Sequence, residues 1–287
     1  MTYLKDSDTI NQCEAAEALG IVGRNRMEIV IPALMNALTN STGNARACAA
    51  DALARFGNDA RPAVPALLSA SQSQDAYLQI RAATAVKIIA PKTPDALAPL
   101  IKGLKSLEPG VRQQTIYALG SLGTNAAEAI PALLKCLSHP DFTTRYDTTR
   151  ALRDMGLDSD EYIAKLSQNL SDTNDFVSRE SVFTLMSLAK HSELAFVALL
   201  KAMNTSETEV GQQAKFGLID AARNDPKFLL NSLENSDPII RYRALVVFYD
   251  LARGVPDSLS KLRQLATNDP DANVRSLASD VLRLQLQ

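Results

Sequence analysis

The side chains that could act as nucleophiles or metal ligands are few in this sequence and stand far apart. No two of the three cysteines, Cys13, Cys48 and Cys136, form a C-x-x-C pair, and the two histidines, His139 and His191, are not near each other in the chain. The H-E-x-x-H motif of zinc enzymes and the G-x-x-x-x-G-K-[ST] loop that cradles phosphates are both absent from the sequence. We therefore predict neither a histidine-based metal centre nor a phosphate-binding loop.

One pair of residues has the spacing of a possible nucleophile and base. Cys136 and His139 are three residues apart and could share one face of a helix, but His139 is followed by Pro140 at the expected helix end. There an imidazole interacts favourably with the helix dipole. We interpret Cys136 as a core thiol and predict that the protein is not an enzyme and has no cofactor. All three cysteines are expected to be reduced, buried thiols, because they show no pairing pattern and leave one odd.

Composition and charge argue against two classes of partner. The chain has 287 residues, a net charge of −2, a pI of about 5.8 and no Trp. A protein that binds nucleic acid by neutralising phosphates would normally show a basic excess, so nucleic acid is not expected as a partner. No apolar run reaches the roughly 20 residues of a membrane span, and the start M-T-Y-L-K-D-S-D is not a signal peptide. We expect a cytoplasmic protein without a membrane partner.

The elements that would position these residues belong to an internal repeat. The segment Y-A-L-G-S-L-G…I-P-A-L-L-K-C-L at Tyr117–Leu137 has copies at Glu17–Leu38 and Asp51–Ser71. Aligning all copies on Arg112 gives nine anchor positions, 29 to 35 residues apart. They are Gln12, Arg46, Arg81, Arg112, Arg145, Arg179, Gln212, Arg241 and Arg275.

Each copy predicts two helices. Small or apolar residues follow the anchor at offsets of three, four and seven, which is one face of an α-helix. A second helix follows and often opens with proline, at Pro32, Pro65 and Pro131. Glycines between the helices would allow tight turns: Gly20, Gly23, Gly57, Gly120 and Gly123. No single hairpin can bury its apolar face, so neighbouring hairpins must stack.

This pattern resembles HEAT repeats of the short bacterial kind. The residues that carry the resemblance are V-R-x-x-x-x-x-A-L-G-x-L-G and I-P-A-L-L-x-x-L, clearest at Val111–Leu137. The resemblance covers essentially the whole chain and implies an all-α fold, a right-handed α-solenoid or armadillo-like superhelix of eight to nine stacked hairpins. We expect residues 1–287 to form one continuous solenoid. In this family the anchor resembles a buried polar ladder, in which Arg pairs with an Asp or a backbone carbonyl of the adjoining repeat, and Gln12 and Gln212 fit that role.

A column of polar residues follows the apolar pair in the second helices. It comprises Asn36, Ser69, Lys102, Lys135, Gln168, Lys201, Asn231 and Arg263. None is acidic and four are basic, and Lys105 and Lys165 could extend the column. The resemblance places second helices on the concave surface. The column therefore predicts a groove for an acidic or helical protein segment, with a merely solvated polar face as the alternative.

The resulting hypothesis is a non-enzymatic scaffold that binds a protein partner in the concave groove. The alternative is a subunit of a HEAT-type enzyme system such as a phycobilin (chromophore) lyase, which only the shared repeat type supports. Both ends lack polar caps, which predicts either a segment of a longer array or self-association through the ends. A weak joint is expected near residues 205–235, because Gly211 and Gly217 fall inside a predicted helix.

Overall fold

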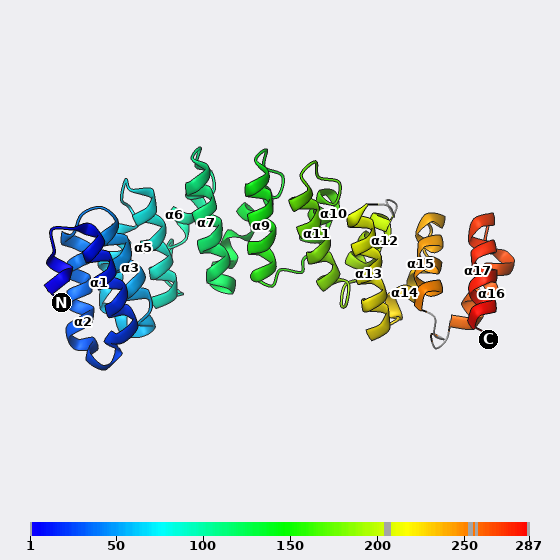
Figure 1. Cartoon of the computed structure of the whole chain (residues 1–287), viewed down its shortest axis with the longest axis horizontal. Helices are drawn as coiled ribbons and strands as arrows, with labels where there is room; N and C mark the ends of the chain where they lie inside the picture. The colour runs from blue at the N-terminus through cyan, green and yellow to red at the C-terminus, as the bar shows by residue number, and fades with distance from the viewer. Residues whose placement is uncertain (1, 204–207, 252–254, 256–257, 286–287) are drawn as a thin grey trace. The chain divides into compact units, whose positions relative to one another are not determined.

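The computed structural model describes residues 2–203, 208–251, 255 and 258–285, and every regular element in them is helical (Figure 1). The first helices of the repeats are α1 (Thr9–Val22), α3 (Asn44–Ala54), α5 (Ala76–Ile89), α7 (Pro109–Leu122), α9 (Phe142–Asp154), α11 (Asp175–Leu188), α13 (Glu209–Asn224), α15 (Pro238–Leu251) and α17 (Ala272–Gln285). The second helices are α2 (Met27–Asn40), α4 (Val64–Ala70), α6 (Ala98–Gly103), α8 (Ile130–Cys136), α10 (Asp160–Asn169), α12 (Glu193–Ala202), α14 (Lys227–Ser232) and α16 (Ser258–Asn268). Short 3-10 helices are η1 (Thr2–Lys5), η2 (Gly23–Arg26), η3 (Gly57–Ala63) and η4 (Gly123–Ala129). The described residues thus contain eight helix pairs followed by α17, as the repeat predicts.

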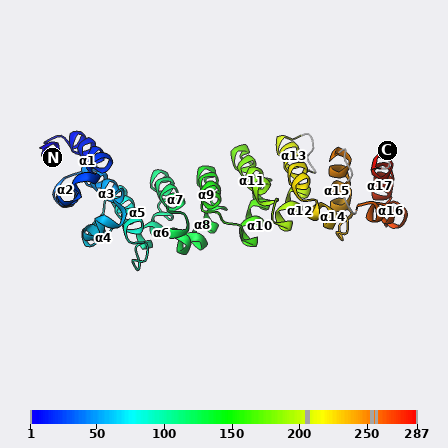
Figure 2. The same ribbon diagram turned by 90° about the horizontal axis from the view of Figure 1, so that it is seen from below.

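The chain divides into two compact units, which we call the N-terminal unit (Met1–Leu157) and the C-terminal unit (Asp158–Gln287). Within each unit, first helices pack against neighbouring first helices and form one layer, while second helices form the other (Figure 2). Each unit is therefore a stack of helical hairpins, and the predicted all-α solenoid architecture is confirmed. That residues 1–287 form one continuous body stays a prediction.

The core lies between the two layers of each unit. The predicted apolar residue seven positions after the anchor is fully buried in four of the nine repeats, at Leu53, Leu119, Leu152 and Phe248, and half-buried in four others. The third repeat departs from this pattern, because Ile88 is 43% exposed while Val86 is fully buried. The predicted register of that repeat is therefore wrong by two residues.

The anchor side chain explains this register. Arg112 donates from Nη1 to the backbone carbonyls of Ser106 (2.9 Å) and Leu107 (3.2 Å) in the loop that precedes α7. Gln79 donates from Nε2 to Ser73 O at the same six-residue separation. The same two-carbonyl arrangement recurs at Arg145, Arg241 and Arg275. The predicted polar ladder is thus confirmed at these positions, where it satisfies loop carbonyls that would otherwise lack partners.

Two predicted anchors are corrected. The N-cap stands four residues before the anchor in most repeats, and this rule makes Gln79 and Ser178 the anchors of α5 and α11. The side chains of Arg81 and Arg179 are instead 43% and 46% exposed, and each pairs with a carboxylate of a neighbouring repeat. Gln212 lies at the expected position after its N-cap but is exposed. Matching by residue type favoured arginine, whereas the capping residue fixes where each helix begins.

The prolines and glycines predicted at helix starts and turns have different roles in the structure. Pro65 and Pro131 lie in the first turn of α4 and α8 as predicted, but Pro32 lies inside α2. Gly57 and Gly123 have positive φ values of 55° and 56°, which glycine adopts without steric cost. Gly20 and Gly120 lie inside α1 and α7 rather than in turns, and a Cβ on either would be about 3 Å from an alanine of the next repeat. Their role is close helix packing, which corrects the predicted turn role.

The predicted weak joint falls partly on residues 204–207, which lie outside the described residues. The helix that follows, α13, continues through Gly211 and Gly217 as expected. A change of curvature and faster amide exchange in 205–235 stay predictions.

Candidate functional site

The structure places the predicted polar column on the second helices, one residue per helix. The residues are Asn36 on α2, Ser69 on α4, Lys102 on α6, Lys135 on α8, Gln168 on α10, Lys201 on α12, Asn231 on α14 and Arg263 on α16. Seven of the eight are exposed and Asn231 is half-buried. The column therefore occupies a surface position in each unit.

Helical periodicity explains why this position faces solvent. In α8, Leu133 and Leu134 are 0% and 5% exposed and pack into the core, whereas the next residue, Lys135, is exposed. In α6, Leu100 is fully buried and Lys102 is exposed. An apolar pair that covers the core forces the following residue outward on a 3.6-residue helix. Exposure alone is also what a solvated polar face would show.

Charge distinguishes the N-terminal unit. Lys102 and Lys135, together with Lys105 just after α6, are exposed and form no ion pair with any described residue. The other second helices of this unit carry one charged residue, Glu28, at the start of α2. Unpaired lysines raise the local potential and attract anionic groups.

The C-terminal unit has a mixed face instead. Asn231 donates from Nδ2 to Glu193 Oε2 at 3.3 Å, and Lys261 pairs with Glu234. Acidic residues also open α10, at Asp160 and Glu161. The column thus has two basic residues in each unit, but acidic residues are more numerous on the second helices of the C-terminal unit.

Asn36 of the column lines a cavity. Asn36 lies in a hollow of about 560 Å³ between η1 and α2, with Leu4 and Pro32 among its other walls. Six of the other column residues are exposed and Asn231 is half-buried, so the arrangement suits contact with an extended or helical segment better than enclosure of a small molecule.

Buried charged side chains hold neighbouring helices and loops together through hydrogen bonds and ion pairs. Arg241 donates from Nε and Nη2 to the two carboxylate oxygens of Asp269, at 2.7 and 2.8 Å, in the C-terminal unit. The Arg241 hydrogen bond holds the pKa of Asp269 below its ordinary value, and Asp269 raises the pKa of Arg241. At Asp141, burial raises the pKa, but hydrogen bonds from Thr144 and Thr143 outweigh it and lower the pKa below the ordinary range.

These shifts predict acid sensitivity. A lowered carboxyl pKa stabilises the fold above the unfolded-state value of about 4, and that contribution is lost as the pH falls through the folded-state value. We expect the free energy of unfolding to fall between pH 5 and pH 3, and the fall to be smaller in Asp269→Asn. Urea denaturation at a series of pH values measures it. An unchanged pH dependence in Asp269→Asn would contradict a contribution from this pair.

The predicted burial of Cys136 is confirmed, and the interaction of His139 with the helix dipole stays a prediction. Burial raises the pKa of the Cys136 thiol, which donates to Ala132 O, while His139 Nδ1 accepts from the backbone N–H of Asp141. The two side chains are thus engaged separately.

The other two cysteines correct the prediction, because Cys13 and Cys48 are half-buried and joined by a disulfide. Their near-equivalent offsets after anchors Gln12 and Arg46, in adjacent repeats, are the signal that could have revealed the pair.

The fold and face described above define an α-solenoid of repeated helical hairpins. A model of HEAT repeats matches residues 1–87, 64–153 and 97–189, which together cover more than half of the sequence. The chain belongs to the HEAT-repeat family. Comparison with curated protein sequences finds no match. Among the described residues, no helix is both long and apolar enough to cross a membrane.

Similar solved structures are distant in sequence. The karyopherin Kap121p, bound to the extreme C-terminus of the phosphatase Cdc14p, aligns with a TM-score of 0.60 at 13% identity over 97% of this chain and 36% of that one. An engineered protein aligns with a TM-score of 0.46 at 22% identity, over 99% of this chain and 87% of that one. The CpcE–CpcF complex of phycocyanin lyase from Nostoc sp. PCC7120 aligns with a TM-score of 0.43 at 24% identity, over 87% of this chain and 92% of that one. The karyopherin supports the solenoid fold, and the chain spans about a third of its length.

Proposed function

We propose that this protein is a non-catalytic cytoplasmic scaffold that binds a protein partner through the exposed face of its second helices. The observation that carries the proposal is the column itself, in which eight consecutive second helices present a polar residue at one position and none presents an acid. A face that only needed to be solvated could use glutamate and aspartate freely, and the chain has 32 of them.

The partner segment is expected to be acidic where it meets the N-terminal unit. Lys102, Lys105 and Lys135 form no ion pair with any residue in the described part of the chain, so a ligand can use their charge without breaking one. Exposed charges of this kind mainly increase the association rate and the specificity, and salt weakens their effect. Affinity for the partner should therefore fall as ionic strength rises.

The test is charge reversal at two positions of the N-terminal unit. In Lys102→Glu/Lys135→Glu, partner affinity should fall by about tenfold or more at low salt, because the new carboxylates repel acidic groups. Thermal stability should change little, since exposed substitutions usually stay within about 0.5 kcal/mol. Proteins captured by the wild-type chain identify the partner, and titration of that partner against each variant gives the affinities.

A matched control separates a local effect from net charge. Lys92→Glu/Arg223→Glu changes the net charge equally at exposed positions outside the second helices. The proposal expects this control to retain both the captured partner and its affinity. Equal loss in both variants, or no loss in either, would exclude the second-helix face as the binding surface.

A further inference from the structure

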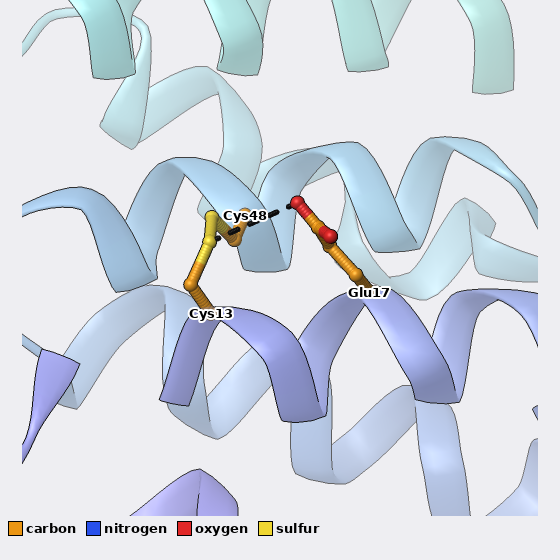
Figure 3. A group of neighbouring side chains, drawn as sticks. All are labelled: Cys13, Glu17 and Cys48. Carbon is orange, nitrogen blue, oxygen red and sulfur yellow. Dashed lines mark hydrogen bonds between the residues drawn. A yellow bond between two sulfur atoms is a disulfide. The ribbon is translucent and has the colours of Figure 1, made fainter. Parts of the chain in front are cut away.

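A disulfide joins the first helices of the first two repeats. Cys13 lies on α1 and Cys48 on α3, 35 residues apart in sequence, and their Cα atoms are 5.3 Å apart (Figure 3). That separation lies within the range that disulfides span without backbone movement. The helices therefore place the two sulfurs together without any change in the hairpins.

The repeat brings the same two positions together elsewhere. Cys13 is one residue after its anchor and Cys48 is two after its own. In α7 and α9, Gln113 and Asp147 hold these positions, and Gln113 Nε2 donates to Asp147 Oδ2 at 3.0 Å. A cross-repeat contact is thus a property of the stack, and the first pair of repeats makes it with sulfur.

The pair is placed for exchange chemistry. Both cysteines are half-buried rather than enclosed, so a small thiol can approach. Glu17 lies one turn after Cys13 on α1, with Oε1 3.9 Å from the Cys13 sulfur (Figure 3). The third cysteine, Cys136, is buried, and burial raises its pKa, so it does not compete as a thiolate.

We propose that Cys13 and Cys48 form a thiol–disulfide exchange site that responds to the glutathione pool and reversibly cross-links the first two repeats. In the oxidising direction, one cysteine thiolate attacks glutathione disulfide and releases one glutathione thiolate, leaving a mixed disulfide. The second cysteine then attacks the mixed disulfide, so that the Cys13–Cys48 bond forms and the second glutathione leaves. The protein loses two electrons and two thiol protons, and glutathione disulfide becomes two thiols. The inference does not depend on the proposed function.

The cross-link should affect local stability. A bond across 35 residues restricts the unfolded chain and holds α1 against α3. In a stack, each repeat depends mainly on its neighbours, so the effect should concentrate in the first two repeats.

Glu17 should slow oxidation, because its carboxylate opposes formation of the attacking thiolate beside it.

The experiment equilibrates the full chain in glutathione buffers of increasing oxidising strength, alkylates free thiols after unfolding and counts them by mass. Oxidised protein should take up one alkyl group and reduced protein three. Amide exchange in α1 and α3 should be at least about tenfold faster in the reduced form. Three alkylated cysteines in every buffer, or equal exchange in both forms, would overturn the proposal.

Variants make the result specific. Cys48→Ala and Cys13→Ser should each abolish the difference between oxidised and reduced protein, whereas Cys136→Ser should keep it. Glu17→Gln should oxidise several-fold faster at neutral pH. Gln113→Cys/Asp147→Cys places thiols at the equivalent positions of α7 and α9 and should form a second cross-link in the same buffers. Failure of this control, with Cys13 and Cys48 still oxidised, would overturn the argument from repeat geometry.

The same group offers a metal-binding arrangement when reduced, since the ligand atoms of Cys13, Glu17 and Cys48 lie within 4.8 Å of one another. One arm of the test therefore adds equimolar Zn²⁺ to reduced protein before glutathione disulfide. Oxidation at an unchanged rate supports the exchange site. Full protection of both thiols by Zn²⁺ would assign the group to metal binding and overturn the proposal.

Discussion

Asp269→Ala is expected to destabilise the C-terminal unit by about 3–5 kcal/mol, because it leaves the Arg241 guanidinium buried without its carboxylate. Arg241 and Asp269 are 8% and 6% exposed and form two short hydrogen bonds to each other. Arg241 would keep only its bonds to the carbonyls of Asn235 and Ser236, which do not compensate a positive charge. Urea denaturation with amide exchange across 208–251 and 258–285 measures the loss.

An exposed ion pair of the same unit gives the control. Lys190 and Asp220 lie 2.9 Å apart, but their side chains are 50% and 51% exposed. Asp220→Ala should therefore change the free energy of unfolding by no more than about 1 kcal/mol. If the two aspartate variants lose similar stability, burial is not what makes the Arg241–Asp269 pair important.

Spacing was the strongest guide in the sequence. It predicted the helix pairs, the family and the exposed position of the column, because a residue after a buried apolar pair must face outward on a helix. That Lys102 and Lys135 bind a partner stays a prediction, since exposure does not reveal a ligand. Cysteine count and local motifs do not indicate the disulfide, because Cys13 and Cys48 lie far apart along the chain and meet across the stack.

Residue type was a weaker guide than local geometry. Arg81 and Arg179 match the other anchors by residue type. The N-caps Asp75 and Asn174 instead place the anchor two residues earlier in α5 and one residue earlier in α11. Pro32 predicts the start of a helix, yet α2 already begins at Met27 and Pro32 lies inside it. A glycine inside a helix is expected to weaken it, and that effect in 205–235 stays a prediction, but the structure also gives several such glycines a packing role.

Gly217 shows this role most directly. A Cβ built on Gly217 in α13 would overlap Cγ of Met186 in α11, and it would lie 3.1 Å from Met186 Cβ. The absence of a side chain therefore lets two neighbouring first helices approach closely. Helix propensity alone favours alanine here by about 1 kcal/mol, but overpacking a tight contact typically costs about 1–3 kcal/mol.

We expect Gly217→Leu to destabilise the C-terminal unit by about 3 kcal/mol, and Gly217→Ala by up to about 2 kcal/mol, against the direction that helix propensity favours. Urea denaturation of both variants measures the effect. Met186→Ala supplies the matched background, because it removes the Cγ and Cε atoms that an added Cβ would meet and keeps only the Met186 Cβ, 3.1 Å away. In that background Gly217→Ala should be neutral or stabilising, and the coupling between the two sites should exceed about 0.5 kcal/mol. If Gly217→Ala instead stabilises the wild-type chain by the full propensity difference, the glycine is a weak point in the helix and the close contact with Met186 relaxes without cost.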